Sequence, residues 1–488
     1  MNKLIYLIFF STLLTGTGFT QPIALHHENP HYLFYKGKAT ILVTSAEHYG
    51  AVLNADFDYE KYLHTMHDEG MNYTRIFTGS YVEIPGSFNI QNNTLAPAVG
   101  SFLTPWKRTN EAGLYKGEKK FNLDEWNPVY FDRLKNFISL ANELDIIVEV
   151  TFFCSTYQDA SWERHPFNPG NNVNEIPVNL ERKKSNTLDN GYLTGYQKKL
   201  VEKITTELNE FDNIFYEIQN EPWSDDPEKV MRTLRTLDPR PGQGDWYKWA
   251  EMASDASLEW QKAMAQVVVE TEKTLPKKHL IAQNYTNFKH SVDKVDPNIS
   301  ILNFHYVWPE AVWMNYGWNR PINFDESGFA GMKTDTYLRQ AWQFMMGGGA
   351  IFNNLDYSFF VGKEDGTGIN NAPGAGNKEF RKRLKFLRNF IESFDFVKMK
   401  PDFNTVYHAP GVQVQSISEP GSQYAMILTG VKSKWIKLNL PKGKYNYEFV
   451  SPFSGKSLKK GFFKHRKNAI KVLNVPEFDQ MVALKITR

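Results

Sequence analysis

Eight strand-like segments alternate with helix-like segments along this chain, and this alternation constrains the fold more than any other feature of the sequence. The strand-like segments are short apolar runs centred near residues 41, 75, 149, 217, 282, 303, 323 and 352. Helical spacing of apolar residues separates most of them, as at 127–144 and 334–346. Strand and helix in alternation produce a parallel sheet, and eight repeats close it into a (β/α)8 barrel, also called a TIM barrel. The sequence therefore predicts an α/β barrel over residues 22–398.

The connections between these segments vary in length. Irregular loops are predicted at 79–124 and 155–189, and a long helix is predicted at 246–274. The connection 306–321 is short and rich in tryptophan, so a loop is expected there in place of a helix. Loops that follow the strands build the active site of such a barrel, so the two long loops could shape either an open cleft or a pocket.

The pattern changes after residue 400, where short strands are separated by Gly, Pro and Ser turns. This spacing predicts a small antiparallel β-sandwich domain over residues 399–488. No row of aromatic residues is peculiar to it, so we expect it to brace the barrel in preference to binding a glycan. The basic run 456–467 could meet an acidic polysaccharide, but a solvated hairpin is the favoured interpretation.

Residues 1–21 have the layout of a secretory signal peptide, because Lys3 precedes an apolar run, 4–14, that ends in small and polar residues. The run is too short to span a bilayer. Export to a periplasm or to the medium is expected, with no membrane span and no cysteine nearby for a lipid anchor. Cys154 is the single cysteine, so no internal disulfide can form.

The charges exclude one class of partner. Lys plus Arg total 56 and Asp plus Glu total 54, so the net charge is +2 and a nucleic-acid partner is not expected. Aromatic residues make up 15% of the chain, and their flat apolar faces suit the C–H faces of sugar rings. His and Cys residues show no zinc-like spacing, so neither a metal nor a cofactor is expected. We expect a monomer with a carbohydrate partner.

Two of the predicted strands end in a carboxylate. The strand near residue 217 ends at Glu221, because Pro222 cannot donate to a ladder, and the strand near residue 323 ends in Glu326. Such strand ends collect catalytic side chains, and a carboxylate pair suggests glycoside chemistry. Asp325 adjoins Glu326, and strand alternation should turn only one of them into the barrel mouth. Glu326 is the favoured residue.

Four elements together resemble the clan A glycoside hydrolases, especially family five, the cellulase type. They are Asn220-Glu221-Pro222, His305-Tyr306, Glu326 with Gly328, and Arg75, each at or after the matching strand. The resemblance implies a retaining reaction with Glu221 as acid/base and Glu326 as nucleophile. It also implies that Asn220 holds the substrate 2-hydroxyl, that Arg75 and Tyr306 hold the nucleophile, and that His305 helps to position the acid or the sugar.

The two carboxylates must differ in protonation, because cleavage needs a proton on the leaving oxygen and negative charge beneath the anomeric carbon. We expect Arg75 to keep Glu326 ionised. The negative charge of Glu326 should then raise the pKa of Glu221 so that it stays protonated near neutral pH. The carboxyl groups should lie about 5 to 5.5 Å apart, the retaining geometry.

Further residues are expected at the lip of the barrel. Trp223 and Trp308 are candidate sugar platforms, and Tyr357 or Phe359 could replace the tryptophan that floors the cleavage subsite in many clan members. The segment Glu47-His48-Tyr49 could bind a sugar hydroxyl or could merely begin a polar loop. Four more tryptophans fall in predicted loops and could line an open cleft: Trp106, Trp162, Trp313 and Trp318.

These features predict a secreted retaining hydrolase of a β-linked polysaccharide or oligosaccharide, such as a β-glucan or a mannan. An open cleft would favour endo action, and a pocket would give an exo-acting β-glycosidase. The alternative outside the enzymes is a glycan-binding barrel that has lost its chemistry. Retention of both carboxylates, with Arg75 and Tyr306 as supports, favours the enzyme.

Overall fold

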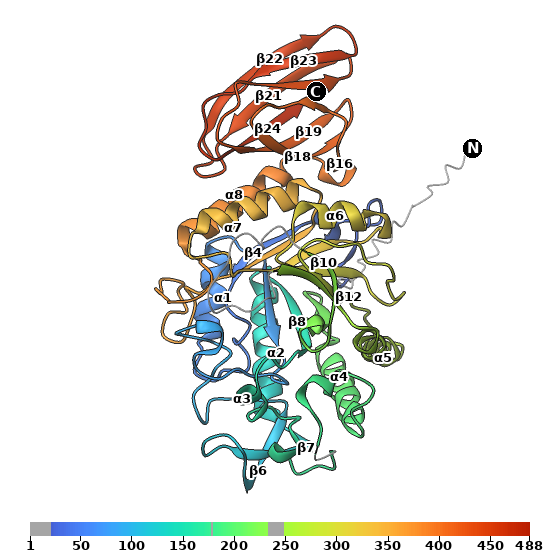
Figure 1. Cartoon of the computed structure of the whole chain (residues 1–488), viewed down its shortest axis with the longest axis vertical. Coiled ribbons are helices and arrows are strands. Elements are labelled where there is room, and N and C mark those ends of the chain that lie inside the picture. Colours follow the sequence, from blue (N-terminus) through green and yellow to red (C-terminus); the bar gives the residue numbers. More distant parts are fainter. Residues whose placement is uncertain (1–20, 177–178, 233–247) are drawn as a thin grey trace, which may run out of the picture.

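The computed structural model describes residues 21–176, 179–232 and 248–488. The predicted signal peptide lies outside the described residues except for residue 21. The described part forms a barrel with a second domain stacked on one side of it (Figure 1). A small antiparallel sheet precedes the barrel, with strands β1 (Ala24–Leu25), β2 (Leu33–Tyr35) and β3 (Lys38–Thr40).

Eight parallel strands form the barrel, and each coincides with a predicted strand. They are β4 (Leu42–Ala46), β5 (Tyr73–Phe77), β8 (Ile147–Cys154), β9 (Ile214–Asn220), β12 (Ile281–Asn287), β13 (Ile301–His305), β14 (Ile322–Ser327) and β15 (Ile351–Leu355). They pair in the order β4–β15–β14–β13–β12–β9–β8–β5. Every residue in them is buried, which explains why their sequences lack a regular alternation of apolar and polar residues.

The barrel closes between β4 and β5 through a side chain. No ladder pairing joins these two strands within the described residues. Asn72, just before β5, instead donates to the carbonyl oxygen of Ile41 at 2.9 Å and accepts from the amide of Val43 at 3.0 Å. At the other end of the seam, the Phe77 amide donates to the Tyr49 carbonyl at 3.1 Å. The amide of Asn72 therefore substitutes for missing backbone bonds.

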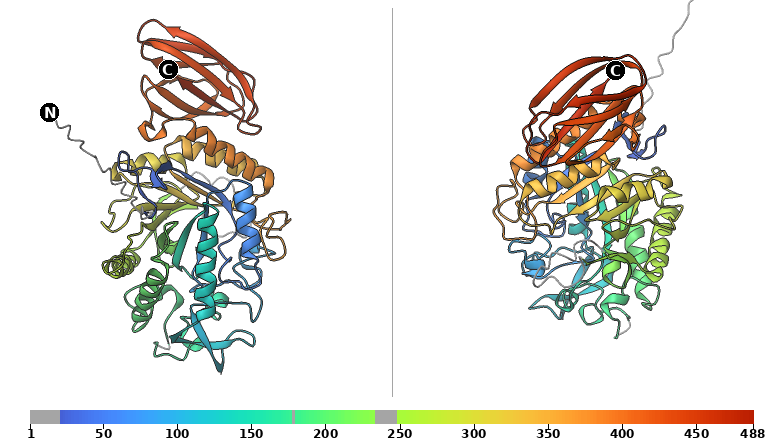
Figure 2. Two further views of the ribbon diagram at one scale, coloured as in Figure 1. Left: turned by 180° about the vertical axis from the view of Figure 1, so that it is seen from behind. Right: turned by 45° about the horizontal axis from the view of Figure 1, so that its top comes forward.

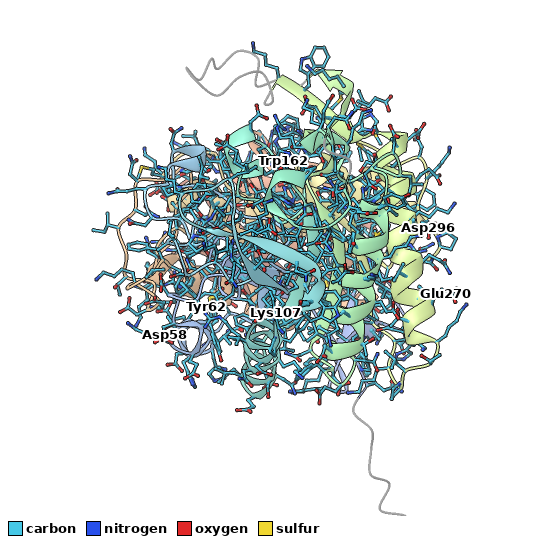
Figure 3. The ribbon with its side chains drawn as sticks, turned by 90° about the horizontal axis from the view of Figure 1, so that it is seen from below. Asp58, Tyr62, Lys107, Trp162, Glu270 and Asp296 are labelled. Carbon is cyan, nitrogen blue, oxygen red and sulfur yellow. The ribbon has the colours of Figure 1, made fainter. Side chains whose placement is uncertain are left out.

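Helices cover the outside of the barrel. They are α1 (Tyr59–Asp68), α2 (Pro128–Glu143), α4 (Leu193–Leu208), α5 (Asp255–Glu272), α6 (Pro309–Asn315), α7 (Thr334–Met346) and α8 (Lys378–Glu392). Asp58 caps α1 by accepting from the Lys61 amide, and Ser254 caps α5 in the same way. Seen from below, Asp58 and Glu270 of α5 lie at opposite sides of this helical ring (Figure 3).

Four connections differ from the predictions. The loop 79–124 contains a hairpin of β6 (Trp106–Ala112) and β7 (Lys119–Trp126), and 155–189 contains the short helix α3 (Asp159–Trp162). The predicted helix 246–274 begins only at Asp255, because β11 (Trp249–Ala253) pairs with β10 (Pro227–Arg232) and Ser254 provides the helix cap. The tryptophan-rich connection 306–321 contains α6, so a helix is present where a loop was expected.

The C-terminal domain is the predicted antiparallel sandwich. One sheet has the order β16 (Lys400–Pro401), β18 (Val412–Glu419), β19 (Gln423–Gly430), β24 (Met481–Thr487), β21 (Gly443–Val450) and β22 (Ser457–His465). The other has the order β17 (Val406–His408), β20 (Trp435–Leu440) and β23 (Ala469–Asn474). The basic run 456–467 lies mostly in β22, which pairs with β21 as a hairpin, as expected.

Strand β19, in the middle of the larger sheet, is buried on both faces. Met426 and Leu428 of β19 pack into the sandwich core, whereas Ala425 and Ile427 belong to the same apolar cluster as the barrel core. Figures 1 and 2 show this sheet stacked beside α7 and α8, on the side away from the β6–β7 hairpin. Helices long and apolar enough to cross a membrane do not occur in the described ranges.

Candidate active site

Glu221 and Glu326 lie together at the mouth of the barrel, although 105 residues separate them in the chain (326 − 221). Glu221 follows β9 and Glu326 belongs to β14, and both line a cavity of about 320 Å³. A carboxylate oxygen of Glu221, a ring nitrogen of His305 and a carboxylate oxygen of Glu326 all lie within 4.8 Å of one another. The fold therefore brings together the two carboxylates that the strand ends indicated.

The backbone around the cavity is strained. Eleven non-glycine residues in the described part of the chain have positive φ. Six of these eleven line the cavity: Tyr49, Phe88, Asn89, Glu221, Tyr306 and Phe329. Left-handed backbone is costly for bulky side chains, and it clusters where function requires a particular side-chain direction.

Two tyrosines hold Glu326. Tyr306 donates to Oε1 of Glu326 at 2.5 Å, as predicted, and Tyr49 donates to Oε2 at 3.0 Å. Arg75 also pairs with Glu326, as expected, although loosely, because its Nη1 lies 3.8 Å from Oε2. The main ion pair of Arg75 is with Glu217 of β9, one layer deeper in the barrel. The hydrogen bond from Tyr49 to Glu326 was not predicted, although Tyr49 belongs to the segment 47–49 that was expected at the lip of the barrel.

Asp325 and Glu326 both face the barrel interior, which contradicts the expected alternation. β14 carries a bulge here, because Phe304 and His305 on β13 face Phe324 and Glu326 with Asp325 as the extra residue. Asp325 is fully buried and accepts from the side-chain amides of Asn284 at 3.0 Å and Asn303 at 3.1 Å. Glu326, not Asp325, reaches the cavity.

His305 links three carboxylates from beneath the cavity. Its Nδ1 lies 2.8 Å from Oε1 of Glu221, and its Nε2 lies 3.3 Å from Oδ1 of Asp325. Burial alone would lower the pKa of His305, but the negative charges of Asp325 and Glu326 and the hydrogen bonds raise it well above its usual value. The ring is therefore an imidazolium near neutral pH.

The protonation of Glu221 differs from the prediction. Burial acts to raise the pKa of Glu221, but the hydrogen bond and positive charge of His305 outweigh burial and lower it. The prediction considered the negative charge of Glu326 and overlooked the cation between the two carboxylates. The lowered pKa of Glu221 and the raised pKa of His305 therefore favour the shared proton of the pair on the histidine.

Asn220 and Trp223 lie beside Glu221, as predicted. The amide of Asn220 donates to the Tyr157 hydroxyl at 2.8 Å, and its carbonyl accepts from Arg75 at 2.8 Å. Trp223 lines the cavity and meets the ring of His305 edge to face, with centroids 5.4 Å apart. His48 also lines the cavity and lies 3.2 Å from Glu83.

Other predicted residues lie away from the cavity. Glu47 is fully buried and accepts from the amides of Gly50 and Ala51, both at 3.0 Å, so it holds the turn after β4. Tyr357 packs behind His48, with ring centroids 5.6 Å apart. Trp308 lies under Lys289, whose Nζ is 4.7 Å from the ring centroid. Within the described residues, Trp223 is the one predicted tryptophan that lines the cavity.

Several cavity residues were not predicted. Glu83 and Phe88 come from the long loop after β5, Tyr157 follows β8, and Phe329 follows β14. Glu251 of β11 also lines the cavity, and burial raises the pKa of its carboxyl group to about 7. The loops had been recognised as candidates, but their sequences do not indicate which side chains turn inward.

Two clusters have spacings that could suit a metal ion. They are Glu221, His305 and Glu326 at the cavity, and the buried trio Glu149, Glu217 and Asp325. Arg75 lies against the buried trio and is within 3.9 Å of each of its three carboxylates. In the cavity cluster the cation is His305 itself, whose Nδ1 lies 2.8 Å from Glu221 and 3.8 Å from Glu326. A cationic side chain of the protein therefore lies at each cluster, and the cavity cluster is suited to proton transfer.

No protein-family model matches the sequence, and no curated protein matches it either. Solved structures do match. A protein from Bacteroides vulgatus ATCC 8482, provisionally named a glycoside hydrolase, aligns with a TM-score of 0.64 and 14% identity over 97% of this chain and 83% of its own. The chain shares its fold with glycoside hydrolases. A family 5 glycoside hydrolase from the same organism gives a TM-score of 0.56 at 13% identity, covering 96% of this chain and 93% of its own.

A third structure, named a glycoside hydrolase, gives a TM-score of 0.56 at 12% identity, with 96% of this chain and 97% of that chain covered. The shared fold therefore includes both the barrel and the C-terminal domain, because each alignment extends over nearly the whole chain. At these identities the likeness concerns the fold.

Proposed function

We propose that this protein is a retaining glycoside hydrolase that acts on β-linked polysaccharides or oligosaccharides, with Glu326 as nucleophile and Glu221 as acid/base. The observation that carries the proposal is the pair of carboxylates, whose nearest oxygens lie within 4.8 Å across a cavity. Retaining enzymes have carboxyl groups about 5 to 5.5 Å apart, whereas inverting enzymes need about 6.5 to 9.5 Å to admit a water molecule.

In the first step, a carboxylate oxygen of Glu326 forms a bond to the anomeric carbon as the bond from that carbon to the leaving oxygen breaks. The electron pair of the broken bond goes to the leaving oxygen, which takes the proton of Glu221. The product is a glycosyl ester on Glu326 and a free alcohol. Tyr49 and Tyr306 each donate to Glu326, so its carboxylate is fixed in direction before the substrate arrives.

In the second step, water attacks the anomeric carbon and gives one proton to the Glu221 carboxylate. The ester bond to Glu326 breaks, and the sugar leaves with its original anomeric configuration. At the end of the cycle the proton is back on the His305–Glu221 pair and Glu326 is ionised, as at the start. No co-reactant other than water is needed.

The His305–Glu221 pair supplies the acid proton. In the free protein this proton resides on Nδ1 of His305, 2.8 Å from the Glu221 carboxylate. A glycosidic oxygen beside Glu221 displaces water and favours the neutral pair, in which the proton has moved to Glu221. His305 therefore stores the proton, and Asp325 beneath it keeps the ring oriented.

Neighbouring residues would bind the substrate. Asn220 borders the cavity with its amide aligned by Arg75 and Tyr157, which suits a hydrogen bond to the sugar 2-hydroxyl. Trp223 offers the apolar face against which a sugar can pack. The charged start and short apolar run of residues 1–21 support export of the mature chain.

Hydrolysis of a panel of aryl β-glycosides and β-linked oligosaccharides tests the proposal. The wild type should cleave at least one substrate, and proton NMR should show the β-anomer as the first product. Glu221→Gln and Glu326→Gln should each lower kcat/KM by about 10³-fold or more on a natural leaving group, as loss of a general acid or a nucleophile does. Glu202→Gln, an exposed change on α4, is the matched control and should remain fully active.

Two results would contradict the proposal. Binding of a glycan with no cleavage of any β-linked substrate would indicate a binding protein. Activity that survives Glu326→Gln but is abolished by Asp325→Asn would assign the nucleophile to the neighbouring residue.

A further inference from the structure

The two carboxylates define the direction in which a substrate lies in the cavity. The leaving oxygen must lie beside Glu221, at the end of β9, because it receives the proton there. The ring that carries the anomeric carbon lies over Glu326 of β14. The leaving group therefore extends toward β9 and β12. The part of the substrate on the other side of the cleaved bond must extend over β4 and β15.

That second side is closed by aromatic side chains. Phe88, from the loop after β5, meets Phe329, just after β14, with ring centroids 6.1 Å apart and the rings nearly perpendicular. Around the closed barrel, β4 and β15 lie between β5 and β14, so this contact crosses the mouth of the barrel above them. Phe88 also packs against Tyr157, with centroids 5.1 Å apart.

The wall is held by its backbone as well as by packing. Phe88 and Phe329 both have left-handed φ, 55° and 54°. Each conformation turns a bulky side chain into the cavity at an energetic cost that a solvent-exposed loop would not retain. Both side chains line the cavity together with the two catalytic carboxylates.

A polar pair lies on the same closed side. His48 follows β4, and its Nε2 lies 3.2 Å from Oε1 of Glu83, which comes from the loop after β5. Glu83 is fixed further by Asn93, which donates to Oε2 at 2.5 Å. Nδ1 of His48 is buried and has no hydrogen-bond partner among the described residues, although the ring lines the cavity. A buried ring nitrogen without a partner is costly, and a ligand hydroxyl would satisfy it.

We propose that the enzyme is exo-acting and accepts a single sugar at the non-reducing end of a β-linked chain. The Phe88–Phe329 contact ends the site beyond that sugar, and the His48–Glu83 pair hydrogen-bonds its terminal hydroxyls. The inference rests on the proposed glycosidase function of Glu221 and Glu326 and specifies its substrate. A cavity of about 320 Å³ agrees with this, since it is at the small end of the roughly 300 to 1,000 Å³ of ligand pockets.

Two series of oligosaccharides with a fluorophore at the reducing end test the proposal. In the free series the non-reducing end is unmodified. In the capped series a ketal bridges the 4- and 6-hydroxyls of the terminal sugar. The wild type should shorten the free chains by one sugar at a time from the first moments of reaction. It should cleave the capped chains at least 10³-fold more slowly. The double variant Phe88→Ala, Phe329→Ala should raise the ratio of capped to free cleavage at least tenfold.

The matched control is Phe462→Ala, an exposed phenylalanine on β22 of the C-terminal domain, which should leave the capped-to-free ratio unchanged. His48→Ala should raise KM for the free chains more than it lowers kcat, because it removes a contact to the bound sugar. Cleavage of capped chains by the wild type, or early release of products longer than one sugar, would overturn exo action and leave the proposed hydrolase intact. Failure of the wild type to cleave either series would overturn both.

Discussion

The most informative single residue is His305, because it sets the protonation of Glu221. A buried imidazolium between carboxylates from β9 and β14 makes the acid a two-residue unit. The proton of such a unit belongs to the pair, so the pH dependence of catalysis reports a shared ionisation.

We expect His305→Gln to move the alkaline limb of the kcat/KM profile to lower pH. In the wild type that limb reports loss of the shared proton, which occurs well above pH 6.5 because the pKa of His305 is strongly raised. In the variant the same limb reports the Glu221 carboxyl alone, which loses its proton at lower pH than an imidazolium stabilised by carboxylates. The pH dependence of aryl glycoside hydrolysis measures this.

The matched control for His305→Gln is His64→Gln, a change at a solvent-accessible position on α1, which should leave both limbs in place. An alkaline limb that stays at the wild-type pH in His305→Gln would show that the acid proton does not depend on His305.

Tyr49 gives a second prediction about a single residue. Its hydroxyl donates to Glu326 at 3.0 Å, and a hydrogen bond to a charged group contributes about 1.5 to 3 kcal/mol. Tyr49→Phe should therefore lower kcat by about 10- to 100-fold with KM nearly unchanged, since Tyr49 acts by positioning the nucleophile. Steady-state kinetics of Tyr49→Phe measure the effects on kcat and on KM separately. Tyr192→Phe, at an exposed position, is the control. An equal loss in kcat and gain in KM would point to a substrate contact instead.

The two carboxylates at the cavity could be predicted because each lies at the end of a strand. Glu221 precedes a proline, and Glu326 ends an apolar run. The positions of Asp325 and Arg75 could not be predicted, because the first depends on a bulge in β14 and the second on which of several buried carboxylates lies nearest. Neither effect leaves a periodic signal in the sequence.

At the scale of elements, the seam between β4 and β5 is the weakest part of the barrel sheet. Asn72 makes two hydrogen bonds across it, at 2.9 and 3.0 Å to backbone groups next to and within β4. Asn72→Ala leaves both groups without these partners, at about 1 to 3 kcal/mol for each buried group. Urea denaturation should show a loss of about 2 to 4 kcal/mol in the free energy of unfolding.

The control for this seam is Asn110→Ala, an exposed position on β6, which should change stability by less than about 0.5 kcal/mol. If Asn72→Ala lowers the free energy of unfolding by no more than this control does, other contacts close the seam.

The eight barrel strands could be predicted because their apolar runs are buried on both sides. The hairpin β6–β7 was missed, since its exposed strand residues are mostly polar and charged and resemble a loop. The start of α5 was misplaced because Trp249–Ala253 is as compatible with a helix as with β11 until its partner β10 is known. Pairing between distant segments is information that local patterns do not contain.

At the scale of the molecule, the two domains share a core. Alternate residues of β19 face opposite ways, so Ile427 joins the apolar cluster of the barrel while Met426 joins that of the sandwich. Polar links add to this, including Arg339 of α7, whose guanidinium donates to Gln480 at 2.9 Å. This continuity supports the expectation that the C-terminal domain braces the barrel.

We therefore expect the protein to unfold in one calorimetric transition. Ile427→Asp places a charge in this shared core, so it should separate the transition into two or lower Tm by several degrees. Val431→Asp, at a position that is 90% exposed, should leave the calorimetric trace unchanged. Two resolved transitions in the wild type would show that the domains unfold independently.

The left-handed residues at the cavity have an evolutionary consequence. Glycine at Tyr49, Glu221, Tyr306 or Phe329 would relax the backbone, so each of these side chains is retained against a gain in stability. Selection on activity alone opposes that gain. In descendants that no longer need the reaction, these positions should be among the first to drift toward glycine or asparagine, while the buried strands beneath them are preserved. The residues at these strained positions should therefore differ between lineages that have kept the reaction and lineages that have lost it.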